Sequence, residues 1–537
     1  MPLEPSSVAD RRLELVSITL IAAALIFAFL TRVVSVFHYI DFYGDEARFA
    51  GHVMDMWQGI WPAFGPHPYN QPFGLPPLYF YLAWPLSALG PNPVFQALLN
   101  AILSFCSVPL LGYLVYRLLD GVARQQRLLL SSIAALWWSV SYVDIQLNNK
   151  EWNPSLIPFF LMCLALLYAT QLQEKLSPSM RALCWILYGV VAAILVSLHG
   201  STLFIIPVIF CASLLYYVVV VNRNRKARWV YPALAVASML ACLTPYWGEE
   251  LRSHWANTQT IFATIHSAAA ASAGLSTKIS NAASAYFSLI SEMYFPVGGG
   301  SIRHASSAAA LGIRVLAFIF FVATPLLAIA YFRGNKLILG FMAAIWVVYL
   351  YAASNFLAIY VHYKMPIVLA PMILGIGSLA YLNYKSAWGR VAGAFLLVCV
   401  LLSMLSNVRL DLGYLAAKFG SRRLVTTSDI AQAFQKLPAG ATVCSERQAE
   451  TNDQRSTRNR DFLAALGYID RFETNKNLKF VWPCAPGDYL IHSRYAFAHD
   501  PYFLPVYQDL RVVQNPEPGN DTQVVARGRT YLIELLR

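Results

Sequence analysis

Residues 13–36 read LELVSITLIAAALIFAFLTRVVSV, an apolar run that is long enough to cross a bilayer as a helix. No small-residue cleavage site follows the run, so we interpret it as a retained first helix and not as a signal peptide. Of the 537 residues, 57% are hydrophobic and only 13% are charged. A soluble chain could not bury so much apolar surface, so the composition indicates a polytopic membrane protein.

Further apolar runs recur along the chain, near residues 93–116, 128–147, 154–172, 182–199, 202–221, 229–247, 309–332, 336–354, 362–383 and 391–408. With the first run they predict about eleven transmembrane helices. The basic residues behind the net charge of +12 gather in alternate loops, such as 117–127 and 223–228, and form no nucleic-acid-binding stripe. This bias predicts a cytoplasmic N-terminus, and the odd number of spans then places the C-terminus outside.

The first outer loop, residues 37–90, carries an unusual group of acids. Asp41, Asp45, Glu46 and Asp55 lie close together in sequence, where they repel one another beside the membrane. The segment YGDEARFA, residues 43–50, predicts a short helix whose first turn holds Asp45 and Glu46, and the helix dipole favours ionised carboxylates there. Such a carboxylate suits a general base, with an arginine three residues later to orient it. A loop whose acids only face water remains an equal alternative.

Two segments of this loop resemble the first outer loop of the GT-C glycosyltransferases. DEARFA at residues 45–50 is followed by PPLYFYL at residues 76–82, and the pattern is similar to the protein O-mannosyltransferases and the aminoarabinose transferases of lipid A. EWNPSLIP at residues 151–158, His199, and YKMP at residues 363–366 extend the resemblance over roughly residues 10–410. It implies a GT-C fold, a sugar donor carried on polyprenyl phosphate, and an acid at position 45 that acts as base or binds the acceptor.

The chain departs from these families at two positions. Leu75 stands where aminoarabinose transferases have a lysine implicated in binding the carrier phosphate, and Asn153, near Glu151, stands where many relatives have a second aspartate. Another cation must therefore meet the phosphate. Lys150, Lys364 with His362, and Arg303 with His304 are the candidates.

The candidate site follows from the resemblance and from the side of the membrane on which these residues fall. Asp45 is the expected base and Glu46 the second choice. The expected substrate-binding residues are Asp41, Tyr43, Arg48, Lys150, Glu151, Asn153, His199, His362, Tyr363 and Lys364. Lys364 as a snorkelling span-end lysine and His199 as a hydrogen-bonded helix-end residue remain alternatives. No metal-ligand or nucleotide motif occurs, so no cofactor is expected, although the acids could recruit a divalent metal.

Two regions outside the spans complete the predicted organisation. The long outer loop, residues 248–308, predicts short amphipathic helices and a Gly-rich segment. After the transmembrane catalytic domain, residues 1–412, the polar residues 413–537 predict a small extracytoplasmic α/β domain. Its helix-like patterns lie at 428–436 and 460–467, and its strand-like patterns at 478–482, 488–492 and 523–535. Cys444 and Cys484, the two cysteines of this domain, could form a disulfide in an oxidising compartment.

The sequence therefore predicts an α-helical GT-C membrane enzyme of the bacterial inner membrane. It would move a sugar from a polyprenyl-phosphate donor to a lipid, glycan or protein acceptor at the periplasmic face. A transporter or flippase of lipid-linked sugars is the alternative. Paired broken helices and inverted halves, which are typical of transporters, are not evident in the hydropathy.

Overall fold

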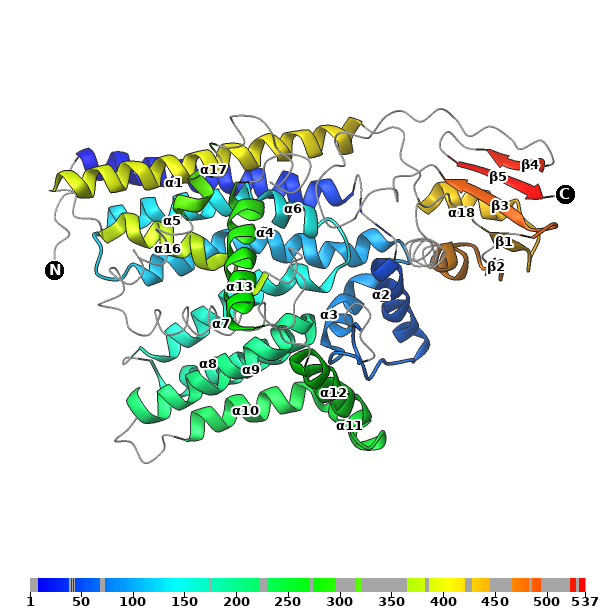
Figure 1. Cartoon of the computed structure of the whole chain (residues 1–537), viewed down its shortest axis with the longest axis horizontal. Helices are drawn as coiled ribbons and strands as arrows, with labels where there is room; N and C mark the ends of the chain where they lie inside the picture. Colours follow the sequence, from blue (N-terminus) through cyan, green and yellow to red (C-terminus); the bar gives the residue numbers. More distant parts are fainter. Residues whose placement is uncertain are drawn as a thin grey trace.

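The computed structural model describes residues 8–37, 40, 42, 44–67, 73–173, 176–221, 229–270, 274–295, 312, 315–320, 365–381, 386–420, 427–444, 466–481, 485–493, 522–527 and 531–536. Helices dominate this part of the chain (Figure 1). Six of its helices are long and apolar enough to cross a membrane, and a bent pair could add a seventh. The six lie at Asp10–Val34, Pro93–Leu118, Asn153–Gln171, Pro178–Leu198, Gly200–Val221 and Ala387–Gly413. All six overlap predicted runs, and the protein is a multi-pass membrane protein.

These spans are built from α1 (Val8–Ala28) with the π-helical turn η1 (Phe29–Val34), α4 (Pro93–Leu118), η3 (Asn153–Leu156) with α7 (Ile157–Gln171), α8 (Pro178–Leu198), α9 (Gly200–Tyr216) with η4 (Tyr217–Val221), and α17 (Ala387–Gly420). Local signals start several of them. Asn92 accepts a hydrogen bond from the backbone N–H of Val94 at the start of α4, and Ser177 accepts one from Met180 at the start of α8. Each of these caps precedes a proline, which needs no partner for a backbone N–H in the first turn.

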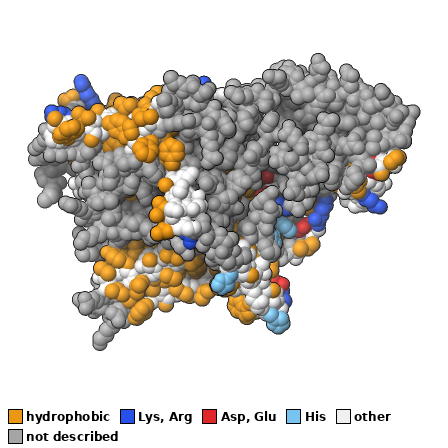
Figure 2. Space-filling view, viewed as in Figure 1, with side chains coloured by type: hydrophobic (Ala, Val, Ile, Leu, Met, Phe, Trp, Pro, Cys, Tyr) orange, Lys and Arg blue, Asp and Glu red, His pale blue; other side chains and the backbone are white. Residues whose placement is uncertain are grey.

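The bundle has one large apolar core, and its outer surface is also apolar. α1 packs against α5 (Arg124–Ser139), α5 against α4, α7 against α8, and α8 against α10 (Val230–Cys242). Exposed apolar side chains such as Leu187, Val208 and Leu240 cover the face formed by α8–α10 (Figure 2). A helix that is apolar on all sides is suited to contact neighbouring helices on one side and lipid tails on the other.

Two predicted spans differ in the structure. The run 128–147 is interrupted at Val140 and Ser141, which separate α5 from the short helix α6 (Tyr142–Leu147). The run 229–247 is divided into α10 and α11 (Thr244–Arg252), which are bent by 62° at their junction. Most of the predicted runs 309–332 and 336–354 lies outside the described residues, so the count of eleven stays a prediction.

The short helices of the first loop and α11 lie at one end of the bundle (Figure 1). The first loop forms α2 (Gly44–Asp55), the 3₁₀ turn η2 (Met56–Gln58) and α3 (Leu78–Ser87), and the long loop forms α12 (Ala256–Ala270) and α13 (Leu275–Leu289) followed by the π-helical turn η5 (Ile290–Tyr294). Between α2 and α3 the backbone folds back on itself, because Gly65 donates to the carbonyl of Leu75 at 2.5 Å. A Cβ at Gly65 would lie 2.2 Å from the Pro76 carbonyl oxygen, so only glycine fits there.

The C-terminal region contains a five-stranded mixed sheet in the order β2-β1-β3-β5-β4. The strands are β1 (Thr442–Cys444), β2 (Lys479–Val481), β3 (Tyr489–Ser493), β4 (Thr522–Arg527) and β5 (Tyr531–Leu536). β1 pairs in parallel with β2 and β3, whereas β5 pairs antiparallel with β3 and β4. The helix α18 (Thr427–Gln435) supplies Phe434 to a small core that includes Val443 of β1. α17 continues to Gly420, past the predicted start of the C-terminal region at residue 413.

Candidate functional site

The two acids of the DEARFA segment point in different directions from the first turn of α2. The Asp45 carboxylate pairs with the guanidinium of Arg48, and their side chains are 33% and 48% exposed. Glu46 follows at the next position, about 100° further round the helix, and its side chain is only 4% exposed. The predicted helix is therefore present, and Arg48 orients Asp45 as expected.

Glu46 forms a buried ion pair with Lys150 from the segment between α6 and α7. Its Oε1 lies 3.0 Å from Nζ of Lys150, whose side chain is 9% exposed. The same ammonium lies 4.1 Å from the ring centroid of Trp152. Burial raises the pKa of Glu46 to about 7, against the charge of Lys150, which lowers it. Glu46 thus titrates near neutral pH, as groups that exchange protons in active sites often do.

Side-chain hydrogen bonds hold the irregular segment that presents Lys150. The amide nitrogen of Asn100 in α4 donates to the carbonyls of Lys150 and Trp152, at 2.9 and 2.8 Å. Ser155 donates to the carbonyl of Leu147 at 2.6 Å, and the Asn153 amide donates to the carbonyl of Leu198. Backbone groups inside the bundle need such partners where no helix supplies them.

Glu151 is buried beside this ion pair. It is 1% exposed, and neither of its carboxyl oxygens has a hydrogen-bond partner among the described residues. Burial raises the pKa of Glu151 well above its usual range, and the charge of Glu46 raises it further. The Tyr79 hydroxyl is likewise buried without a partner in this part of the structure, and burial together with Glu151 raises the pKa of Tyr79. Burial and the neighbouring charge of Glu46 therefore favour the neutral, hydrogen-bond-donating form of Glu151.

A second buried ionic cluster was not identified from the sequence. Arg32, in the first span, donates to Asp144 of α6 at 2.8 Å, to Ser104 of α4 at 2.7 Å, and to the carbonyls of Trp138 and Ser139. Arg32 and Asp144 are 0% and 2% exposed. A lone arginine in an apolar run is costly without a partner, so the presence of Arg32 in the first span could have indicated a buried acidic partner. Asn148 donates to Asp144 at 3.0 Å, which ties this cluster to the segment carrying Lys150.

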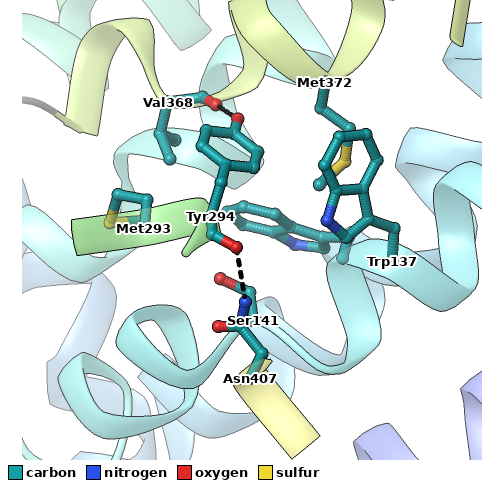
Figure 3. Close-up of a pocket in the computed structure, with 8 residues that line it drawn as sticks. Trp137, Ser141, Met293, Tyr294, Val368, Met372 and Asn407 are labelled. Carbon is teal, nitrogen blue, oxygen red and sulfur yellow. Dashed lines mark hydrogen bonds between the residues drawn. The ribbon is translucent and has the colours of Figure 1, made fainter. Parts of the chain in front are cut away.

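Figure 3 shows a narrow pocket between helices of the bundle. Its eight lining residues are Trp137, Trp138, Ser141, Met293, Tyr294, Val368, Met372 and Asn407, none of them charged. The Asn407 amide donates to the carbonyl of Tyr294 at 3.3 Å, and the Tyr294 hydroxyl donates to the carbonyl of Val368. These hydrogen bonds connect the helices that line the pocket. The lining has no positively charged side chain that could bind a phosphate. Trp137, Trp138 and Trp152 are buried.

The remaining predicted residues have different outcomes. His199, 7% exposed, caps α9: its Nδ1 accepts from the backbone N–H of Ser201 at 3.2 Å, as its structural alternative predicts. Cys444 is disulfide-bonded. Predicted residues outside the described part of the chain are Asp41, Tyr43, Arg303, His304, His362, Tyr363, Lys364 and Cys484. Among the described residues, no three His, Cys, Asp or Glu side chains lie close enough to hold a metal ion.

No protein-family model matches the sequence, and no curated protein matches it. The structure is similar to ArnT from Cupriavidus metallidurans bound to undecaprenyl phosphate, with a TM-score of 0.51 and 14% identity over 96% of this chain and 97% of that one. The apo state of ArnT aligns over the same shares with 14% identity and a TM-score of 0.52. An oligosaccharyltransferase from Archaeoglobus fulgidus aligns with a TM-score of 0.47 and 13% identity, over 89% of this chain and 69% of that one. This chain has the GT-C fold of ArnT over nearly its whole length, as the motifs of the first loop predicted.

Proposed function

We propose that this protein is a membrane glycosyltransferase that moves a sugar from a polyprenyl-phosphate carrier to a hydroxyl group of an envelope acceptor. The observation that carries the proposal is the buried Glu46–Lys150 ion pair, which sits one residue from Asp45. The pair brings the acidic first turn of α2, in the first outer loop, next to the Lys150 ammonium in the segment between α6 and α7. The ArnT fold, seen with undecaprenyl phosphate, supports the donor class.

Asp45 is the proposed general base. Its carboxylate is partly exposed and is oriented by Arg48, so an acceptor hydroxyl can approach it. The hydroxyl oxygen attacks the anomeric carbon of the donor while its proton passes to Asp45. The bond from this carbon to the phosphate oxygen breaks, its electron pair stays on the phosphate, and the configuration is inverted.

Lys150 is the proposed cation for the leaving phosphate. Its ammonium is compensated by Glu46, whose pKa of about 7 lets it take up a proton near neutral pH. Protonation of Glu46 removes that compensation and leaves the positive charge available to a phosphate. Lys364 with His362, and Arg303 with His304, are the other candidates for this role, and the proposed reaction uses no cofactor.

The remaining parts of the proposal concern location and acceptor. The fold and the distribution of basic loops favour the inner membrane, with a cytoplasmic N-terminus and a periplasmic site. Residues 413–537 would shape the access of a lipid, glycan or protein acceptor without doing chemistry.

A purified-protein assay with a panel of polyprenyl-phosphate sugars tests the function. Protein in detergent, with no second compartment, should release polyprenyl phosphate in the presence of the correct donor and an extract of envelope glycolipids as acceptor. Mass spectrometry should detect the acceptor with one added sugar. Movement of labelled donor across vesicles without any such product would favour the transporter alternative.

A further inference from the structure

The C-terminal region contacts the helix that carries the proposed base. Residues 466–474, which precede β2, lie against α2. Tyr468 is 4% exposed and packs against Ala47 and Ala50 of α2. Its ring also meets Phe42, just before α2, edge-to-face with centroids 5.1 Å apart. Small alanine side chains allow this close approach.

Polar contacts accompany the apolar ones. The Arg471 guanidinium pairs with Asp55 at the C-terminal end of α2, at 2.6 Å. The Tyr468 hydroxyl donates to the carbonyl of Pro91, in the turn before α4, at 2.5 Å. Residues 466–474 therefore contact α2 at both of its ends and also hold the adjoining turn.

The segment is itself well ordered by one buried acid. Asp470, 4% exposed, accepts hydrogen bonds from the backbone N–H groups of Lys476 and Leu478, at 3.1 and 2.7 Å, and from the Thr474 hydroxyl at 2.6 Å. Because these hydrogen bonds fix the conformation of residues 466–474, the contacts of this segment can hold α2 in one position.

We propose that Tyr468 and Arg471 are positioning residues for the reaction: together they hold α2 so that Asp45 stays at the donor and acceptor. Ala47 and Ala50 lie within about one helical turn of Glu46, so Tyr468 contacts α2 close to the position of the Lys150 ion pair. This inference rests on the proposed function and gives residues 413–537 a role beyond acceptor access.

Kinetics of five variants test the positioning. Tyr468→Ala should lower kcat per folded molecule by on the order of tenfold to a hundredfold, because small misplacements of a catalytic group cost that much. Phe480→Leu, in the sheet core but away from α2, is the matched control and should change kcat less than threefold. Arg471→Glu and Asp55→Lys should each lower kcat, and the doubly reversed variant should recover at least half of the loss. A purely structural contact would reduce the folded fraction and leave kcat per folded molecule unchanged.

Hydrogen–deuterium exchange over residues 44–55 separates the inference from the proposed function. Tyr468→Ala should speed exchange of the α2 amides at least tenfold, whereas Phe480→Leu should not. Equal exchange in wild type and Tyr468→Ala would overturn the contact, and faster exchange with unchanged kcat would overturn the positioning role. If the wild type transfers no sugar while Tyr468→Ala still speeds exchange, the proposed function and its positioning role fail, and the contact alone stands.

Discussion

Removing the ammonium from the Glu46–Lys150 pair should destabilise the protein in a way that depends on pH. Lys150→Met keeps the length and the apolar stem of the side chain but strands a carboxyl group that is 4% exposed. A buried pair broken from one side typically loses about 3–5 kcal/mol, because the remaining charge is left uncompensated. Glu46 can escape this cost by taking up a proton, so the loss should approach that range at pH 8 and be smaller at pH 6.

The sign follows from the pKa of Glu46. Its usual value is 4.5 and burial raises the pKa to about 7 in the folded protein, so the folded state binds more protons between these values. Stability therefore decreases as the pH rises through this window, by about 3 kcal/mol in total at 1.36 kcal/mol per pKa unit. Lys150 opposes the rise, so in Lys150→Met the pKa of Glu46 should be higher and the decrease should extend to higher pH.

A double-mutant cycle measured by unfolding of the detergent-solubilised protein tests this reasoning. Glu46→Gln/Lys150→Met should be more stable than the sum of the two single losses predicts, because it leaves neither charge unpaired. Its stability should also vary less with pH than that of the wild type. Additive losses, or an equal loss at pH 6 and pH 8 in Lys150→Met, would refute the buried ion pair.

Three further stability predictions follow from the packing. Arg32→Met should cost about 3–5 kcal/mol by stranding buried Asp144, and Arg32→Met/Asp144→Asn should recover part of this in the same unfolding assay. Gly189→Ala in α8 should lower the melting temperature because its Cβ would lie 2.1 Å from the carbonyl oxygen of Ala235 in α10, whereas Gly248→Ala, with nothing within 4 Å, should not. Cys444→Ser should cost about 2–4 kcal/mol in the C-terminal region under oxidising conditions, and reductant should abolish the difference from wild type.

Features set by local sequence were predictable. The first turn of α2 follows from the acids at its start, and the apolar runs locate six spans because a membrane helix needs length and hydrophobicity alone. Strands β2 and β3 overlap the patterns at 478–482 and 488–492, whereas the single pattern at 523–535 forms the two strands β4 and β5. β1, Thr442–Cys444, matches none of the predicted strand patterns.

Contacts between distant segments could not be predicted in the same way. Glu46 and Lys150 were both candidates, but their pairing depends on how α4 places the carbonyls of residues 150 and 152. The contact of Tyr468 with α2 joins segments more than 400 residues apart, and nothing in either segment indicates the other. The break between α5 and α6 likewise involves a distant residue, because Arg32 donates hydrogen bonds to the backbone carbonyls of Trp138 and Ser139 at the end of α5.

Release of polyprenyl phosphate by the Asp45→Asn variant tests the central claim most directly. The substitution keeps the size and hydrogen bonding of the side chain but removes its basicity, so turnover should decrease on the order of a hundredfold or more. Glu249→Gln, at an exposed ion pair with Arg252 in α11, should stay within about twofold of wild type as the matched control. Near-normal turnover by well-folded Asp45→Asn would contradict the assignment of Asp45 as the base.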